Sequence, residues 1–180
     1  MEAFEITPTV KPPKLKSEDE DFNAYLLRWP KQLSNVPEDV IKNWAFVHNQ
    51  QVIEFCSSYD LSAWRFKLEK FDNDEILKIS HFKDELEKID GKSFRLFTGE
   101  LNGYDTADFM LQHGTFPCPI IVAHNAGNIV HHRSTKNETM IEPYHLIEGN
   151  RRLGFIREMI RTKYENLKSN HEVWVVSIDQ

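Results

Sequence analysis

The fold is indicated most clearly by residues 144–153, which read YHLIEGNRRL. Tyr144 to Ile147 have the composition of a strand, and Glu148 and Gly149 follow them directly. Glycine enters backbone conformations that other residues adopt only with strain, so it is suited to a tight turn. Asn150, a residue type that often begins helices, comes next. These residues predict a strand, a turn and a helix, in that order.

The neighbouring segments extend this prediction to a sheet. After the turn, apolar residues recur at helical spacing and predict a helix from about 151 to 168. The apolar run at 119–123 is bounded by turn residues and predicts a buried strand, and residues 173–178 predict a final strand. We expect the strands at 119–123, 144–147 and 173–178 to share one sheet, with the helix packed on it.

The rest of the chain predicts an α+β fold, with a mixed sheet, packed helices and a helical N-terminal extension. Residues 1–20 are expected to be a tail, flexible or held along the surface; 21–100 the mostly helical part of the same domain; and 101–180 the half that carries the pocket. The local predictions are helices at 37–57, from Asn73 to about 89, and at 106–112 between Asp105 and Gly114, with strands at 64–69 and 93–97.

Composition limits the functions that are plausible. The formal net charge is −6, whereas proteins that hold duplex DNA by its phosphates usually present a basic face. We therefore expect no binding of long duplex DNA by the chain alone. The two cysteines, Cys56 and Cys118, have no metal-binding or disulfide spacing. No signal-peptide pattern and no apolar run of membrane-spanning length is present, so no membrane partner and a cytoplasmic location are expected.

Arg151 and Arg152 stand where a helix is expected to begin. The N-terminus of a helix carries a partial positive charge, so each cation there is disfavoured by about 0.3–1 kcal/mol. A bound anion would compensate, because free N–H groups and guanidinium groups both favour phosphate. The alternative is that the arginines pair with a protein carboxylate such as Glu148. The spacing alone leaves both explanations open.

Two segments resemble the ParB box of the ParB/sulfiredoxin superfamily. They are residues 113–122, HGTFPCPIIV, and residues 145–153, HLIEGNRRL. Members show a glycine before a P-I-x-V strand, followed by a strand that enters an acidic-Gly-x-x-Arg turn at a helix start. The resemblance covers about residues 105–178. It implies the fold of that superfamily and a nucleotide pocket.

The resemblance also implies roles for individual residues. Gly149, Asn150, Arg151 and Arg152 would bind the phosphates of a nucleoside di- or triphosphate, accompanied by Mg²⁺. Glu148 would coordinate the metal or act as the catalytic base, and His113 and Gly114 would reach the nucleotide. Sulfiredoxins have a cysteine where Asn150 stands, so their redox chemistry is not expected. Partition proteins continue into a DNA-reading domain, for which the 28 residues after Arg152 leave no room.

The sequence leaves two classes of function open. One is an enzyme that performs Mg²⁺-dependent phosphoryl transfer, NTP hydrolysis or phosphodiester cleavage. The other is a non-catalytic ParB-like module that regulates or binds a protein partner through its N-terminal half. None of the eight histidines shows metal-ligand spacing, so no protein metal ligands are predicted. His131, His132 and Arg133 are expected in a solvated loop or a lid, and His145 in the core or on the surface.

Overall fold

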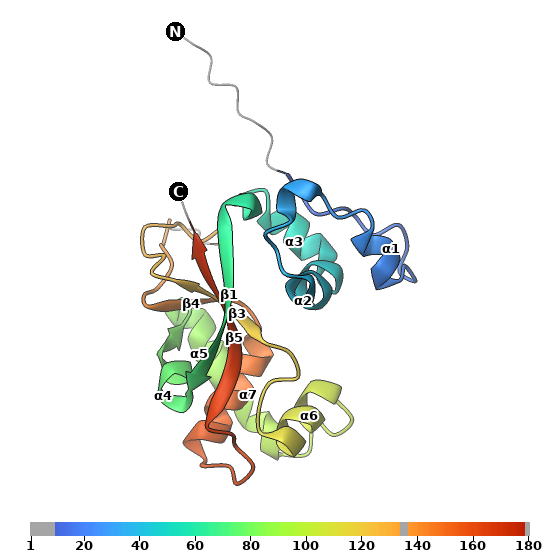
Figure 1. Ribbon diagram of the computed structural model, residues 1–180. Helices are drawn as coiled ribbons and strands as arrows, with labels where there is room; N and C mark the ends of the chain where they lie inside the picture. Colours follow the sequence, from blue (N-terminus) through green and yellow to red (C-terminus); the bar gives the residue numbers. More distant parts are fainter. Residues whose placement is uncertain (1–9, 134–136, 179–180) are drawn as a thin grey trace. The chain divides into compact units, whose positions relative to one another are not determined.

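The computed structural model describes residues 10–133 and 137–178, and it has an α+β fold (Figure 1). The described chain divides into two compact units, one formed by the residues up to Phe66 and the other by Lys67–Ile178. No helix within the described ranges is long and apolar enough to cross a membrane.

The first unit is helical. It contains α1 (Phe22–Leu26), α2 (Glu38–Val40), a π-helical segment (Ile41–Phe46), α3 (Asn49–Phe55) and two short 3₁₀ turns (Lys31–Leu33 and Leu61–Ala63). The predicted helix at 37–57 begins after Pro37 as expected. It is not continuous, because His48 has a non-helical backbone (φ −112°, ψ 38°) before α3 begins.

Aromatic side chains make up a large part of the core of this unit. Those with exposures of 8% or less are Tyr25, Trp44, Phe55, Tyr59 and Trp64. The buried amide of Asn49 donates to the carbonyl of Pro13 (2.9 Å) and accepts from the backbone N–H of Leu15 (3.1 Å). These bonds hold the described part of the predicted tail along the unit, and residues 1–9 lie outside the described residues.

The second unit is built on a five-stranded mixed sheet with the order β1-β5-β3-β4-β2. The strands are β1 (Trp64–Asp72), whose first three residues belong to the first unit, β2 (Ile79–Ser80), β3 (Ile120–His124), β4 (Tyr144–Glu148) and β5 (Asn170–Ile178). β3 pairs parallel with β5 and antiparallel with β4, and β2 pairs parallel with β4. The prediction that 119–123, 144–147 and 173–178 share one sheet is confirmed.

Helix α7 (Asn150–Arg161) packs on this sheet. Its apolar face, which includes the fully buried Leu153, Ile156 and Met159, belongs to the same core cluster as Ile120 and Leu146 of the sheet. The helix ends earlier than the predicted residue 168. Lys163 has a φ of +53°, in the left-handed region that stops an α-helix.

Two local predictions in this unit were wrong. The expected helix from Asn73 to 89 is divided into α4 (Asn73–Lys78), β2 and α5 (Lys83–Ser93). Its cap is Asp72, whose carboxylate accepts from the N–H of Glu75 (2.8 Å). Residues 94–97 form a 3₁₀ helix instead of a strand. Phe94 and Phe97 are 53% and 40% exposed and only Leu96 of these four residues is buried, so the apolar composition of the segment does not reflect burial in the sheet.

α5 lies against α7, and this contact positions the candidate site. The guanidinium of Arg157 donates to both carboxylate oxygens of Asp90, at 2.9 and 3.0 Å. Close approach of the helices depends on Gly154, where a Cβ would lie 3.0 Å from the carbonyl oxygen of Ile89. α6 (Asp105–His113) ends at Gly114 as predicted.

Candidate functional site

The turn between β4 and α7 requires a glycine. Gly149 has a φ of +112°, and a Cβ at this position would lie 2.5 Å from Cγ2 of Ile120 on β3. A larger residue would therefore be strained and would push the turn away from the sheet. Asn150 begins α7, and Gly149 as its N-cap residue offers no side-chain acceptor for the first N–H groups.

Arg152 is built into the protein. Its side chain is 10% exposed and forms a salt bridge with the carboxylate of Glu148. The same guanidinium donates to the carbonyl oxygens of Cys118 (2.7 Å) and Pro119 (3.0 Å). It thus joins the start of α7 to the segment that enters β3. This arrangement corresponds to the alternative in which an arginine of the turn pairs with a protein carboxylate.

Arg151 is in a different environment. It is exposed, donates to the hydroxyl of Tyr104 (3.0 Å), and places its guanidinium carbon 5.3 Å from the centre of the same ring. A phenol is a neutral partner, so neither contact neutralises the positive charge. Of the two arginines in the turn, Arg151 is therefore the one placed to meet an external anion.

A hollow of about 220 Å³ lies between α5 and α7 beside Arg151. Its apolar wall includes Ile89, Gly154 and Phe155. Its polar and charged lining consists of Glu85, Lys88, Lys92, Ser93, Asn150 and Arg151. Three cations and one carboxylate give this lining a formal charge of +2, in a chain whose net charge is −6.

One pair in the lining is already neutralised. Nζ of Lys88 lies 2.5 Å from a carboxylate oxygen of Glu85, one turn away on α5. This leaves Lys92 and Arg151 as the source of the excess positive charge around the hollow.

The structure does not bring His113 and Gly114 to this hollow. Gly114 has a φ of +69°, and a Cβ there would lie 1.7 Å from the carbonyl oxygen of Asn166, which follows the C-terminal end of α7. Asn150 stands at the opposite end of a helix of 12 residues, about 16 Å away along its axis. The exposed ring of His113 lies tilted against Phe109, with the ring centres 4.3 Å apart. His113 and Gly114 thus form the C-terminal end of α6, with Gly114 as its C-cap residue.

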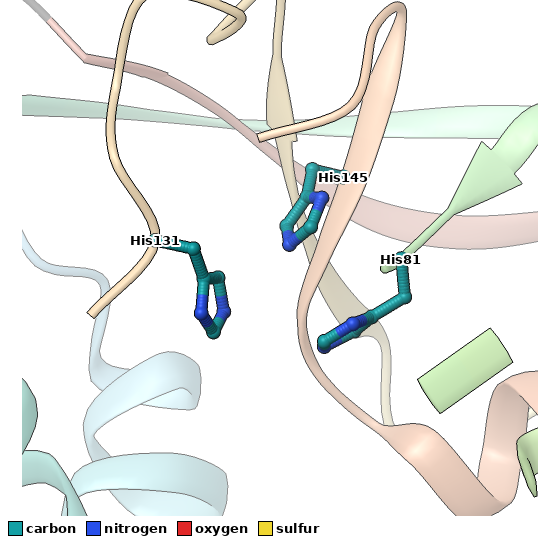
Figure 2. A group of neighbouring side chains, drawn as sticks. All are labelled: His81, His131 and His145. Atoms are coloured by element: carbon teal, nitrogen blue, oxygen red, sulfur yellow. The ribbon is translucent and has the colours of Figure 1, made fainter. Parts of the chain in front are cut away.

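A second group of polar side chains was not foreseen from the sequence. His81 follows β2, His131 lies between β3 and β4, and His145 lies within β4. One ring nitrogen from each lies within 4.8 Å of the others. Figure 2 shows the three rings pointing toward a common space. His131 and His145 are 4% and 0% exposed, and His81 is half-buried.

Backbone groups orient the three rings. Nδ1 of His81 accepts from the N–H of Phe82 (2.8 Å), and Nδ1 of His131 accepts from that of Arg133 (3.1 Å). Nδ1 of His145 accepts from the N–H of Ile141 (3.0 Å), while its Nε2 is buried and has no hydrogen-bond partner.

Burial makes the cluster neutral at physiological pH. Desolvation lowers the pKa of His131 and of His145 to about 3, and it also lowers the pKa of His81. Repulsion from neighbouring imidazoles and from Arg133 adds to the effect at His131. Neutral imidazole is the form that ligates metal ions.

No protein-family model, curated protein sequence or solved structure matches this chain.

Proposed function

We propose that this chain is a ParB-like protein that binds the phosphate groups of a nucleoside di- or triphosphate in the hollow between α5 and α7. The observation that carries the proposal is the position of Asn150 and the exposed Arg151 at the start of α7, beside Lys92. The N–H groups and partial positive charge of a helix start, together with an exposed guanidinium that no carboxylate neutralises, form a common phosphate site.

The size of the hollow suggests how such a ligand would lie. Pockets that enclose a whole small molecule measure about 300–1,000 Å³, and this hollow measures about 220 Å³. It therefore suits the phosphates with part of the nucleoside, and the remainder would stay at the surface. Two charge-assisted hydrogen bonds contribute about 3–6 kcal/mol together, equivalent to dissociation constants from about 10 mM to 50 μM.

Binding, without a committed reaction, is the function that the geometry supports. The carboxylate of Glu148 is paired with Arg152, so it is not free to hold Mg²⁺ or to act as a base in this arrangement. Mg²⁺ would enter with the phosphates, its usual mode of binding at nucleotide sites.

Calorimetry with ATP, ADP, CTP and pyrophosphate, each with and without Mg²⁺, tests the proposal. We expect R151A and K92A to weaken binding about 10- to 100-fold each, the value of one charged hydrogen bond. R95A is the matched control, because Arg95 is an exposed cation paired with Glu100 outside the hollow. The absence of binding at about 20 mM ligand, above the weakest dissociation constant expected, or equal losses in R95A, would contradict the proposal.

A phosphate-release assay separates binding from catalysis. We expect no release above the rate without protein, and no difference between the unmodified chain and E148Q. Release that E148Q abolishes would instead support the enzymatic alternative, with Glu148 leaving Arg152 when the ligand binds.

A further inference from the structure

The cluster of His81, His131 and His145 lies outside the proposed phosphate hollow and has no role in it. The three side chains come from separate segments, and the sheet brings two of them together. β2 pairs parallel with β4 so that Ser80 lies opposite His145, which puts the next residue, His81, beside the His145 ring. The ring centres of these two histidines are 4.8 Å apart, and that of His131 is 5.1 Å from His145.

The surroundings of the cluster point to a ligand. Phe82 packs against His131 (4.6 Å) and His145 (5.4 Å), which limits the access of water from that side. Nε2 of His145 is completely buried without a hydrogen-bond partner. A buried polar atom without a partner destabilises a fold, so such atoms are usually explained by a bound ion, water or functional group.

We propose that His81, His131 and His145 bind one divalent transition-metal ion through their Nε2 atoms, with Zn²⁺ as the reference ion. Imidazole suits zinc, copper, iron and nickel, whereas Mg²⁺ and Ca²⁺ prefer oxygen ligands. The site is thus chemically distinct from any Mg²⁺ that accompanies a nucleotide. Three protein ligands leave a fourth tetrahedral position for water or for a substrate atom.

Metal binding would change the cluster in two ways. Zinc–nitrogen bonds of about 2.0–2.1 Å place tetrahedral ligand atoms about 3.4 Å apart, so nitrogens that now lie within 4.8 Å would move closer. Ligation through Nε2 also requires the ring proton at Nδ1. The Nδ1 atoms would then stop accepting from the N–H groups of Phe82, Arg133 and Ile141.

This second change distinguishes a metal from the main alternative occupant. While Nδ1 accepts a backbone N–H, a neutral imidazole carries its proton on Nε2. The three Nε2–H groups of the cluster could then donate hydrogen bonds to an oxyanion instead of binding a metal ion. That occupant would leave the three backbone hydrogen bonds in place. The environments of the Phe82, Arg133 and Ile141 amides therefore report which ligand chemistry the cluster has.

The test is a titration of the full chain with Zn²⁺, after treatment with EDTA and dialysis and with no nucleotide present. Calorimetry should show one Zn²⁺ per chain, and Co²⁺ should give the absorption of tetrahedral coordination. We expect H81A, H131A and H145A each to weaken Zn²⁺ binding by about 100-fold or more. Loss of a residue that only contacts a metal ligand already weakens binding by about 10- to 100-fold, and loss of a ligand itself should cost at least as much. H113A, which removes an exposed histidine outside the cluster, should bind as the unmodified chain does.

Because His145 is fully buried, its replacement can affect folding, and circular dichroism of each variant accompanies the titration. The half-buried His81 provides the decisive variant. The proposal is overturned if folded H81A binds Zn²⁺ like the unmodified chain, if H113A is equally impaired, or if no binding occurs. It is also overturned if inorganic phosphate, and not Zn²⁺, binds the cluster while the NMR signals of the backbone N–H groups of Phe82, Arg133 and Ile141 stay unchanged. None of these results depends on the nucleotide proposal.

Discussion

Replacement of Arg152 by methionine should destabilise the second unit strongly. The substitution keeps an extended side chain but removes the guanidinium from the Glu148 carboxylate and from the carbonyl oxygens of Cys118 and Pro119. Both charged side chains are at most 15% exposed, so the remaining carboxylate would be largely buried without its partner. Removal of one member of a buried ion pair costs about 3–5 kcal/mol. A domain has about 5–15 kcal/mol of stability in total, so this is a large fraction.

Urea unfolding followed by circular dichroism measures this effect. E148Q should cost less, about 1–3 kcal/mol, because Arg152 keeps its two carbonyl acceptors. The double variant E148Q/R152M should be more stable than the sum of the single changes predicts, by about 0.5–3 kcal/mol for residues in contact. A loss below about 1 kcal/mol in R152M, or strict additivity, would refute the structural role given to this arginine.

Two further changes test other contacts. G114A should destabilise the fold by more than the roughly 1–3 kcal/mol of left-handed strain alone, because its Cβ would also clash with the backbone of Asn166. G91A should be neutral or stabilising by about 0.5–1 kcal/mol, because a Cβ there meets nothing within 4 Å. Similar losses of unfolding free energy in the two variants, measured in urea, would contradict this contrast. Burial lowers the pKa of His171 from 6.5 to about 4 in the folded chain. As the pH falls below about 6.5, the unfolded chain therefore binds a proton at this histidine before the folded chain does, and the free energy of unfolding decreases. Between pH 7.5 and about 5 this loss amounts to about 2 kcal/mol, and H171Q should lack that part of the pH dependence in thermal unfolding.

The central strands and α7 could be predicted from the sequence because their signals are local. The apolar run at 119–123 is bounded by turn residues, and Gly149 separates a strand from a helix within one short segment. β2 could not be predicted, since two residues have no periodicity. Phe94 and Phe97 suggested a strand by composition, but only contacts with the rest of the fold determine which side chains are buried.

The sequence indicated the turn of the candidate site but not the surroundings of its side chains, for a related reason. The sequence singled out Arg151 and Arg152 together, and it could not separate them. The acceptors that bury Arg152 include carbonyls more than 30 residues away, whereas Arg151 meets Tyr104. The histidine cluster joins residues that are 50 and 14 positions apart along the chain. Spacing motifs detect ligands on one helix or loop, so they cannot detect a cluster assembled from separate segments of the fold.

The most direct test of the proposed function is an NMR titration of the ¹⁵N-labelled chain with ADP. The proposal predicts that the largest shift changes occur at the amides of Asn150 and Arg151 and along α5 near Lys92, and that R151A reduces them. Changes concentrated elsewhere, or no change at millimolar ADP with and without Mg²⁺, would contradict phosphate binding at the start of α7.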